Sequence, residues 1–146
     1  MPENIEMSSE ESESLLRRGV VGRVAVSTPT GPHIIPVNYS VVDDAIVMRT
    51  SPHSLLATHG RNAPIAFEVD YIDHEYHHAW SVVAHGRCEV VTDAGALDRI
   101  CALCEPRPWA DSSRNLVLRL AWNELTGRKL GAGWSPEKQL ALGRQV

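Results

Sequence analysis

Cysteine, aromatic residues and long apolar runs are all scarce in this sequence of 146 residues. Three cysteines, an odd number, do not suit a disulfide framework and indicate a reducing compartment. No apolar run approaches the roughly 18 residues that a membrane-spanning helix needs. The first residues, MPENIEMSSEES, are acidic and polar, unlike a signal or transit peptide. These features predict a cytoplasmic protein with no membrane partner.

Dense basic stripes and aromatic stacking platforms are missing as well. With one Phe and three Tyr, few side chains could stack on bases, so we expect no nucleic-acid partner. The net charge is -4, but residues 1–14 carry five acids and no base, so the rest is nearly neutral. Arginine is the dominant base, and its guanidinium suits bidentate contacts to phosphate or carboxylate. The pattern favours a small anionic ligand.

Short alternating apolar runs between turn residues predict a mainly antiparallel sheet in a single domain. We expect helices at 8–18, 51–59 and 94–104, and strands at 20–27, 33–42, 45–50, 64–70, 79–91 and 116–122. The last strand is expected to end at Thr126 and Gly127, and Pro36 marks an edge or a bulge. Six such strands would curl into a small β-barrel to hide their edges. The domain would cover residues 9–130, between a flexible acidic N-terminus (1–8) and a C-terminal tail (131–146).

Two motifs look like metal or redox sites but have simpler explanations. The run His74–His78 (HEYHH) matches the H-E-x-x-H zinc protease signature, which needs both histidines on one helical face. Only eight residues separate Asp70 from Ala79, so we expect a polar hairpin tip and no metal site. A zinc hydrolase and adventitious metal binding are the alternatives. Cys101 and Cys104 form a CxxC late in a predicted helix, where we expect thiols that face the core.

The segment Arg49–Ser54 (RTSPHS) places a guanidinium and three hydroxyls between a strand end and a helix start. Free N–H groups and the helix dipole favour an anion there, and the arginine adds a fork of donors. A turn whose groups are satisfied locally, with an N-cap serine, is the alternative interpretation.

Several short motifs, taken in order, resemble the pyridoxamine 5'-phosphate oxidase-like flavin-binding proteins with a split β-barrel. They span about residues 10–130 and comprise Val21–Ala25, Pro36–Tyr39, Arg49–Ser54, Phe67–Asp70, Trp80–Val82, Gly86–Arg87 and Thr126–Arg128. The resemblance implies an oxidoreductase that acts on a small molecule, as a homodimer with FMN bound between the subunits. The deazaflavin coenzyme F420 or haem replaces FMN in some relatives. A flavin-binding module without turnover is a further alternative.

The same resemblance implies the cofactor contacts. The flavin ring would meet main-chain groups of Pro36, Val37, Asn38 and Tyr39, and the phosphate would meet Arg49, Thr50, Ser51 and Ser54. The facing wall would contain Trp80 and Ser81, from the partner subunit, and Arg128 would make a late contact.

One departure from the family's pattern concerns charge. Leu55 stands where relatives usually carry Lys or Arg, which leaves His53 as the neighbouring group that can become cationic. No catalytic residue is identified, although Tyr39 and His85 are candidate acids. The late segment, rich in Arg and His, that binds pyridoxal phosphate in true oxidases is not recognisable, so we do not expect that activity.

Overall fold

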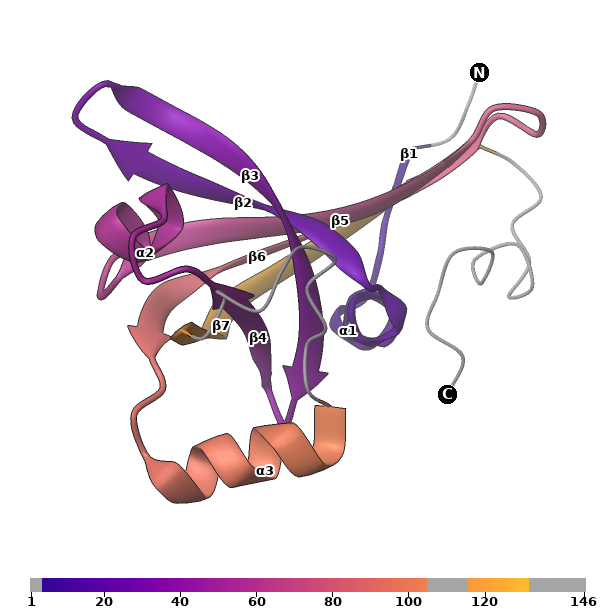
Figure 1. Ribbon diagram of the computed structural model, residues 1–146. Coiled ribbons are helices and arrows are strands. Elements are labelled where there is room, and N and C mark those ends of the chain that lie inside the picture. The colour runs from indigo at the N-terminus through magenta and orange to yellow at the C-terminus, as the bar shows by residue number, and fades with distance from the viewer. Residues whose placement is uncertain (1–3, 105–115, 132–146) are drawn as a thin grey trace.

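The computed structural model describes residues 4–104 and 116–131, which form an antiparallel barrel with three helices (Figure 1). The helices are α1 (Ser9–Arg18), α2 (Leu55–Gly60) and α3 (Ala94–Cys104). The strands are β1 (Asn4–Glu6), β2 (Val21–Thr28), β3 (Gly31–Val42), β4 (Ala45–Thr50), β5 (Pro64–Asp73), β6 (His78–Val90) and β7 (Leu116–Leu130). In the described residues, no helix has the length and apolarity that crossing a membrane requires.

Strands β2 to β7 close on themselves. The sheet order is β1-β7-β4-β3-β2-β5-β6, and β6 pairs again with β7, so six strands complete a ring. Every pairing is antiparallel. The predicted six-stranded barrel is therefore confirmed, and β1 adds a seventh strand beside β7.

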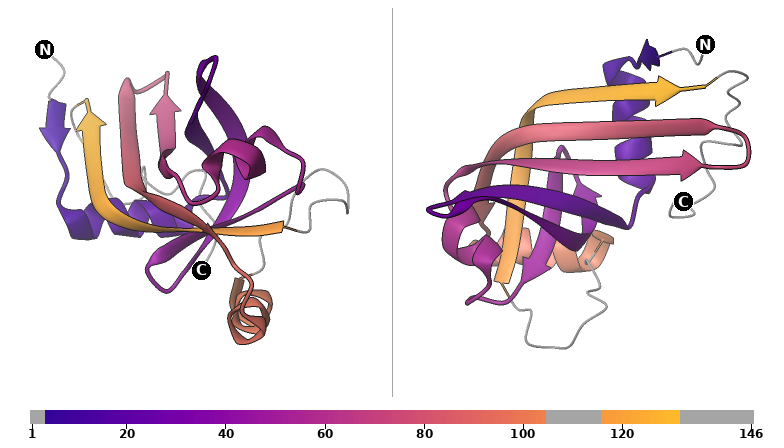
Figure 2. Two further views of the ribbon diagram at one scale, coloured as in Figure 1. Left: turned by 90° about the vertical axis from the view of Figure 1, so that its left-hand side faces the viewer. Right: turned by 90° about the horizontal axis from the view of Figure 1, so that it is seen from above.

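The prediction for the last strand is wrong, because β7 does not stop near Gly127 but continues to Leu130. Gly127 is needed for close approach rather than for a turn, since a methyl group there would overlap the hydroxyl of Ser12 in α1. The first half of β7 pairs with β4 and β6, and the second half pairs with β6 and β1. Figure 2 shows β5, β6 and β7 running side by side into a long arm that α1 crosses.

Helix α1 is anchored to the barrel through a buried tyrosine. The helix begins as predicted, with Ser8 as its N-cap accepting a hydrogen bond from Glu11 N at 3.1 Å. At the other end, Tyr39 is fully buried, and its hydroxyl donates to the Leu16 carbonyl oxygen at 2.6 Å. The Tyr39 ring meets Phe67 edge to face, with centroids 4.7 Å apart. The tyrosine hydroxyl thus serves the fold.

We expect Tyr39→Phe to lower the free energy of unfolding by about 1–3 kcal/mol, because the buried Leu16 carbonyl would lose its donor. Urea unfolding followed by fluorescence measures this difference. Tyr76→Phe is the matched control, since Tyr76 lies exposed in the β5–β6 turn and its change should stay within about 0.5 kcal/mol. Equal stability of the wild type and the Tyr39 variant would contradict the assignment.

Helix α3 has the predicted bounds, but the prediction that Cys101 faces the core is wrong. Asp93 caps the helix by accepting from Ala96 N at 2.8 Å, and Ile100 packs against Val47 and Val117 in a second apolar cluster. Cys101 is exposed rather than facing the core, because the buried stripe of the helix passes through Ile100 instead. The side chain of Cys104 lies outside the described residues.

Helix α2 begins later than predicted. Residues Ser51–His53 form a turn, closed by a hydrogen bond from Ser54 N to the Ser51 carbonyl oxygen at 3.0 Å. Ser54 is the N-cap, and its hydroxyl accepts from Ala57 N at 3.0 Å. Pro52 therefore precedes the helix instead of occupying its first turn. Strand β5 also differs slightly from prediction, since it extends to Asp73 and was expected to end at residue 70.

Candidate functional site

The ring of strands has a split between β3 and β4. From the hairpin turn the two strands pair from Val42 and Ala45 as far as Tyr39 and Met48. Beyond these residues they diverge, at Asn38 and Arg49. Before the split β3 pairs with β2, and β4 continues along β7. The residues predicted to contact the flavin ring (36–39) and those predicted to contact its phosphate (49–54) therefore flank the same opening.

Pro36 fits this edge position. Tyr39 N donates to the Val20 carbonyl oxygen, so odd-numbered residues of β3 direct their main-chain groups toward β2. The main-chain nitrogen of Pro36 consequently faces the split, where its missing hydrogen removes no ladder bond. This confirms the expectation that Pro36 marks an edge. Val37 and Tyr39 turn their side chains into the core, whereas Pro36 is exposed on the outer face.

A small network of hydroxyls lies beside the split. Thr50 is buried, and its hydroxyl donates to Ser54 Oγ at 2.7 Å. Because Ser54 Oγ also accepts from Ala57 N, both of its lone pairs are used and its own hydrogen is left to donate. Ser51 Oγ accepts from His53 N at 3.4 Å. Local hydrogen bonds thus hold these side chains in place while Ser54 keeps one donor.

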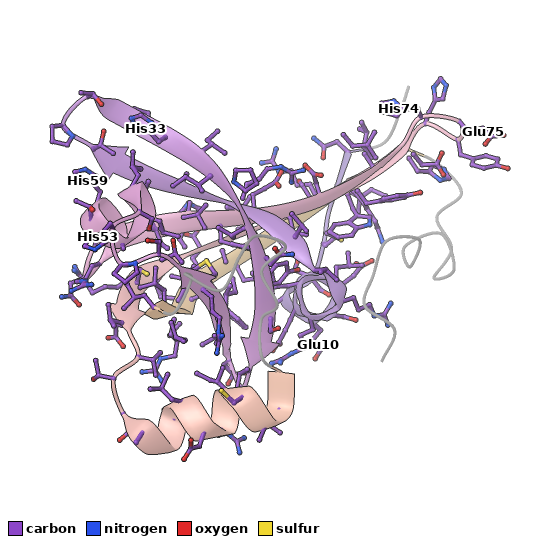
Figure 3. The ribbon with its side chains drawn as sticks, in the orientation of Figure 1. Glu10, His33, His53, His59, His74 and Glu75 are labelled. Carbon is purple, nitrogen blue, oxygen red and sulfur yellow. The ribbon has the colours of Figure 1, made fainter. Side chains whose placement is uncertain are left out.

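The chain segment that carries this network contains basic residues only. The segment 49–61 contains Arg49, His53, His59 and Arg61 and no acid. Figure 3 shows His53 and His59 near α2 at the end of the molecule where the β2–β3 hairpin projects. Leu55 is partly exposed (37%), so it presents an apolar side chain among these basic groups. The surroundings favour an anionic group.

The predicted wall residues lie elsewhere on the chain. Ser81 and Arg128 are register partners across β6 and β7, so the structure brings these two together. Arg128 lies eleven residues beyond Val117, the register partner of Arg49, which is roughly 35 Å of strand. In Figure 3, His74 and Glu75 mark the arm's tip, on the opposite side from His53. Along β7, Arg128 is therefore well separated from the phosphate contacts of the same chain.

Trp80 differs from its neighbour Ser81 because successive strand residues face opposite sides. Its side chain packs in the main core cluster and is 92% buried (8% exposed). Its indole nitrogen has no hydrogen-bond acceptor among residues 4–104 and 116–131. Ser81 instead lies on the outer face of the sheet, opposite Asp70 of β5.

A charged cluster that the sequence reasoning missed lies on that outer face. Arg23 Nη1 is 2.9 Å from Glu68 Oε1 and 3.4 Å from Asp70 Oδ1. Burial raises the pKa of Glu68 to about 7, and a hydrogen bond from the protonated Glu68 to Asp70 and repulsion by that residue add to this rise, against the opposing effect of Arg23. The available signal was alternation, because residues 68 and 70 of one strand share a face.

This raised pKa predicts a pH-dependent stability. Between pH 4.5 and about 7 the folded protein holds a proton on Glu68 that the unfolded chain has released, so stability falls as pH rises. Relative to Glu68→Gln, we expect the wild type to lose on the order of 1–2 kcal/mol across this window, allowing for solvent screening. Urea unfolding at several pH values measures the difference. A constant difference between the two proteins would contradict the prediction.

The two candidate acids occupy different environments. The Tyr39 hydroxyl is committed to the Leu16 carbonyl oxygen in the core, which removes it as a proton donor to a ligand. His85 is exposed on the outer face, and its Nδ1 lies 3.9 Å from Glu124 Oε2. Of the two, His85 alone is open to solvent.

The HEYHH motif forms the turn between β5 and β6, as expected. Asp73 and His78 are register partners, and Asp73 Oδ1 accepts from Glu75 N at 3.0 Å and from Tyr76 N at 3.1 Å. A hairpin turn cannot place His74 and His78 on one helical face, so the arrangement of a zinc protease is not formed. Within the described part of the chain, no three His, Cys, Asp or Glu side chains group to hold a metal ion.

The exposed and buried thiols should differ in reactivity. Burial, followed by repulsion from Glu89, raises the pKa of Cys88 to about 11, which leaves about 10⁻⁴ of it as thiolate at pH 7. In a Cys104→Ser background we expect one thiol, Cys101, to react with Ellman's reagent before unfolding. The double variant C101S/C104S should react only in denaturant. Rapid labelling of that double variant would contradict the burial of Cys88.

Comparison with known proteins places this split barrel in a family. A family model described as pyridoxamine 5'-phosphate oxidase matches residues 8–129. The chain therefore belongs to the pyridoxamine 5'-phosphate oxidase family. An uncharacterised protein of Mycobacterium tuberculosis is 28% identical over 135 residues, which cover 89% of this chain and 88% of that protein.

Solved structures share the architecture. A protein of Mycobacterium smegmatis named as FAD binding superposes with a TM-score of 0.74 at 25% identity, covering 86% of this chain and 98% of the other. A protein of Corynebacterium glutamicum, described as a possible pyridoxamine 5'-phosphate oxidase, also gives 0.74 at 28% identity, with coverage of 90% and 96%. FAD was not among the cofactors expected from the sequence.

Proposed function

We propose that this protein is a homodimeric flavin-dependent oxidoreductase that binds FMN between its subunits and acts on a small molecule. The observation that carries the proposal is the split itself, because two groups of cofactor contacts implied by the family flank it. Residues 36–38 lie on one side and residues 49–54 lie on the other. Family membership over residues 8–129 supports the same cofactor class.

The donor set beside the split fits a phosphate. Ser54 keeps its hydroxyl hydrogen to donate, and the segment 49–61 contains no acid. Arg49 lies on β4 with its Nη2 3.9 Å from Cys101 Sγ of α3, and binding would turn this guanidinium toward the phosphate. Charge-assisted hydrogen bonds of this kind are the stronger ones in proteins. Bound flavin would supply the hydride transfer, and the chain would bind it, orient it and shield it from water.

The separation of Arg128 from the phosphate contacts supports a second subunit. In a dimer, Ser81 and Arg128 of the second copy would face a flavin held at the split. The same outer face carries an apolar row at the arm's end, where Ile72, Ala79 and Leu130 are register neighbours. Ile72 and Leu130 are both exposed, and such patches are typical of contact surfaces.

Three other outcomes are distinguishable. FAD is favoured by the name of the M. smegmatis neighbour, and its extra nucleotide would extend past the phosphate contacts. Coenzyme F420 and a flavin store without turnover remain as alternatives. Redox assays with NADPH and artificial acceptors separate a store from an enzyme.

The proposal is tested by titrating the purified protein with FMN, FAD and coenzyme F420 while light scattering reports its mass. We expect a dimer that binds FMN, with Arg49→Gln weakening binding roughly ten- to a hundredfold. Arg99→Gln, whose side chain pairs with Asp43 at the turn that closes the β3–β4 hairpin, is the control that should leave binding unchanged. A monomer that binds none of the three cofactors would overturn the proposal.

A further inference from the structure

A groove on the outer face of the barrel lies apart from the predicted cofactor contacts. It has a volume of about 490 Å³ and crosses strands β2, β5, β6 and β7. Alternation along β2 explains its position, because Val24 and Val26 turn into the core and leave the residues between them outside. Small or polar side chains line the groove, and they include Ala25, Ser27, Ala66, His85, Arg87 and Asn123. Small-molecule sites in proteins commonly have this size.

Two alanines form the floor of the groove. Ala25 and Ala66 are register partners on β2 and β5, and Ala66 is in turn the partner of His85 on β6. Cross-strand partners have Cβ atoms about 5 Å apart, so the two methyl groups form one continuous apolar surface. The longer side chain of His85 bounds this surface on one side. An apolar group of a ligand can therefore lie on the alanines.

A β-bulge brings a fourth strand to the groove. On β7 the register skips Asn123, because His85 pairs with Glu124 and Gly86 pairs with Trp122. An extra residue of this kind changes the direction in which strand side chains point. Asn123 lines the groove, and its amide adds a hydrogen-bond donor and an acceptor to the rim.

Arg87 gives the groove a positive charge that no carboxylate neutralises. Its Nη1 donates to the main-chain carbonyl oxygen of Asn62, a neutral group that fixes the position of the guanidinium. Among residues 4–104 and 116–131, Arg87 forms no ion pair. Glu68, Glu89 and Glu124, on the surrounding strands, each have another basic residue at 2.9 to 3.9 Å. The remaining N–H groups of Arg87 are thus available to an anionic ligand.

The groove leads from Arg87 toward the split. Pro64 is the register partner of Arg87 and lies at one end of the groove. At the other end, Ala25 is two residues from Arg23 on β2, which is about 7 Å of strand. Arg23 is the register partner of Pro36 at the split. A ligand anchored at Arg87 therefore extends over the alanines toward the edge at which we place the flavin ring.

We propose that this groove binds the substrate and that the substrate is a small organic carboxylate. The carboxylate accepts hydrogen bonds from the Arg87 guanidinium, and the apolar part lies on Ala25 and Ala66. This rests on the proposed function, because it assumes that the flavin ring lies at the split. Arg87 and the two alanines select the class of substrate, and the cofactor supplies the redox chemistry.

Titration of the flavin-free protein with benzoate tests the groove itself. In two-dimensional NMR spectra we expect benzoate to shift the amide signals of Ala25, Ala66 and Asn123. Arg87→Gln should weaken binding roughly ten- to a hundredfold, because charge-assisted hydrogen bonds are lost. Acetate lacks the apolar part and benzamide lacks the charge, so both should bind more weakly than benzoate. Equal affinity of the wild type and Arg87→Gln for benzoate, or no shift in the groove, would overturn the proposal.

Two further variants separate loss of the site from loss of the fold. Ala66→Leu keeps every charge but fills the floor of the groove, so we expect it to weaken benzoate binding as well. Arg99→Gln removes an arginine of α3 that does not line the groove, and it should leave the affinity unchanged. Amide spectra that match the wild type outside the groove show that each variant is folded. Benzoate binding to Ala66→Leu at wild-type affinity would overturn the placement on the alanines.

The absorption spectrum of the flavin-loaded protein tests the link to the cofactor. We expect benzoate to change the flavin absorption of the wild type but not of Arg87→Gln, although both proteins bind FMN. Benzoate binding that leaves the flavin spectrum unchanged would overturn the role of the groove as the substrate site. Failure of the wild type to bind flavin would instead overturn the proposed function and the substrate role with it. The flavin-free titration would still decide whether the groove binds carboxylates.

Discussion

Replacing Leu55 by lysine is expected to tighten FMN binding by roughly ten- to a hundredfold. Leu55 opens α2, directly after the hydroxyl network of Thr50 and Ser54, and is partly exposed. A lysine there restores the cation that the family usually carries, and a charge-assisted hydrogen bond is worth about 1.5–3 kcal/mol. Fluorescence titration with FMN measures the change.

A neutral variant separates charge from shape. Leu55→Gln has similar reach and can donate hydrogen bonds but adds no charge, so we expect it to gain much less than Leu55→Lys. Raising the salt concentration should reduce the advantage of the lysine variant. Equal FMN affinity for wild type and Leu55→Lys would mean that this position does not face the phosphate.

Gly86→Ala is expected to lower the free energy of unfolding by about 3 kcal/mol, as overpacking in a tight site does. A methyl group at Gly86 would overlap the carbonyl oxygen of Ala121 and lie 2.9 Å from Leu120 Cδ1. The first contact is with main chain of the adjacent strand, which cannot move without breaking pairing. Strand register also shifts between His85 and Gly86, where β7 turns from the ring into the arm.

The control for this variant is Gly95→Ala in α3. A methyl group at Gly95 would lie 3.3 Å from Asp93 Oδ2, a side-chain atom, and alanine favours helix more than glycine does. We expect its stability to change by about 1 kcal/mol at most. Urea unfolding of both variants provides the comparison, and a Gly86→Ala protein as stable as Gly95→Ala would contradict the packing argument.

Local signals predicted most of the fold. The cap of α1 at Ser8, the cap of α3 at Asp93 and the alternating runs in β2 to β6 are decided by neighbouring residues, so they can be read from sequence. The end of β7 could not, because Gly127 looks like a stop but is required by Ser12, more than a hundred residues away. The prediction that Cys101 faces the core was wrong for a similar reason, since a small rotation of α3 decides which of its residues are buried.

The candidate site was predicted in part. The motif order singled out the residues around Pro36 and Arg49 as cofactor contacts, which stay predictions, but sequence could not show that β3 and β4 diverge between them. That divergence depends on pairing with β2 and β7, which are distant partners. The proximity of Arg23, Glu68 and Asp70 depends on the register of β2 with β5, and no local pattern specifies a register.

The position of β7 in the ring has a consequence for synthesis of the chain. Residues Leu116–Ala121 fill the gap beside β4, yet they follow their β4 partners by 66 to 76 residues. When the ribosome has made β2 to β6, the sheet therefore has two unpaired edge strands, β4 and β6. Unpaired edge strands can pair with strands of other nascent chains. The barrel becomes safe from this exchange only once its final strand has been translated and inserted.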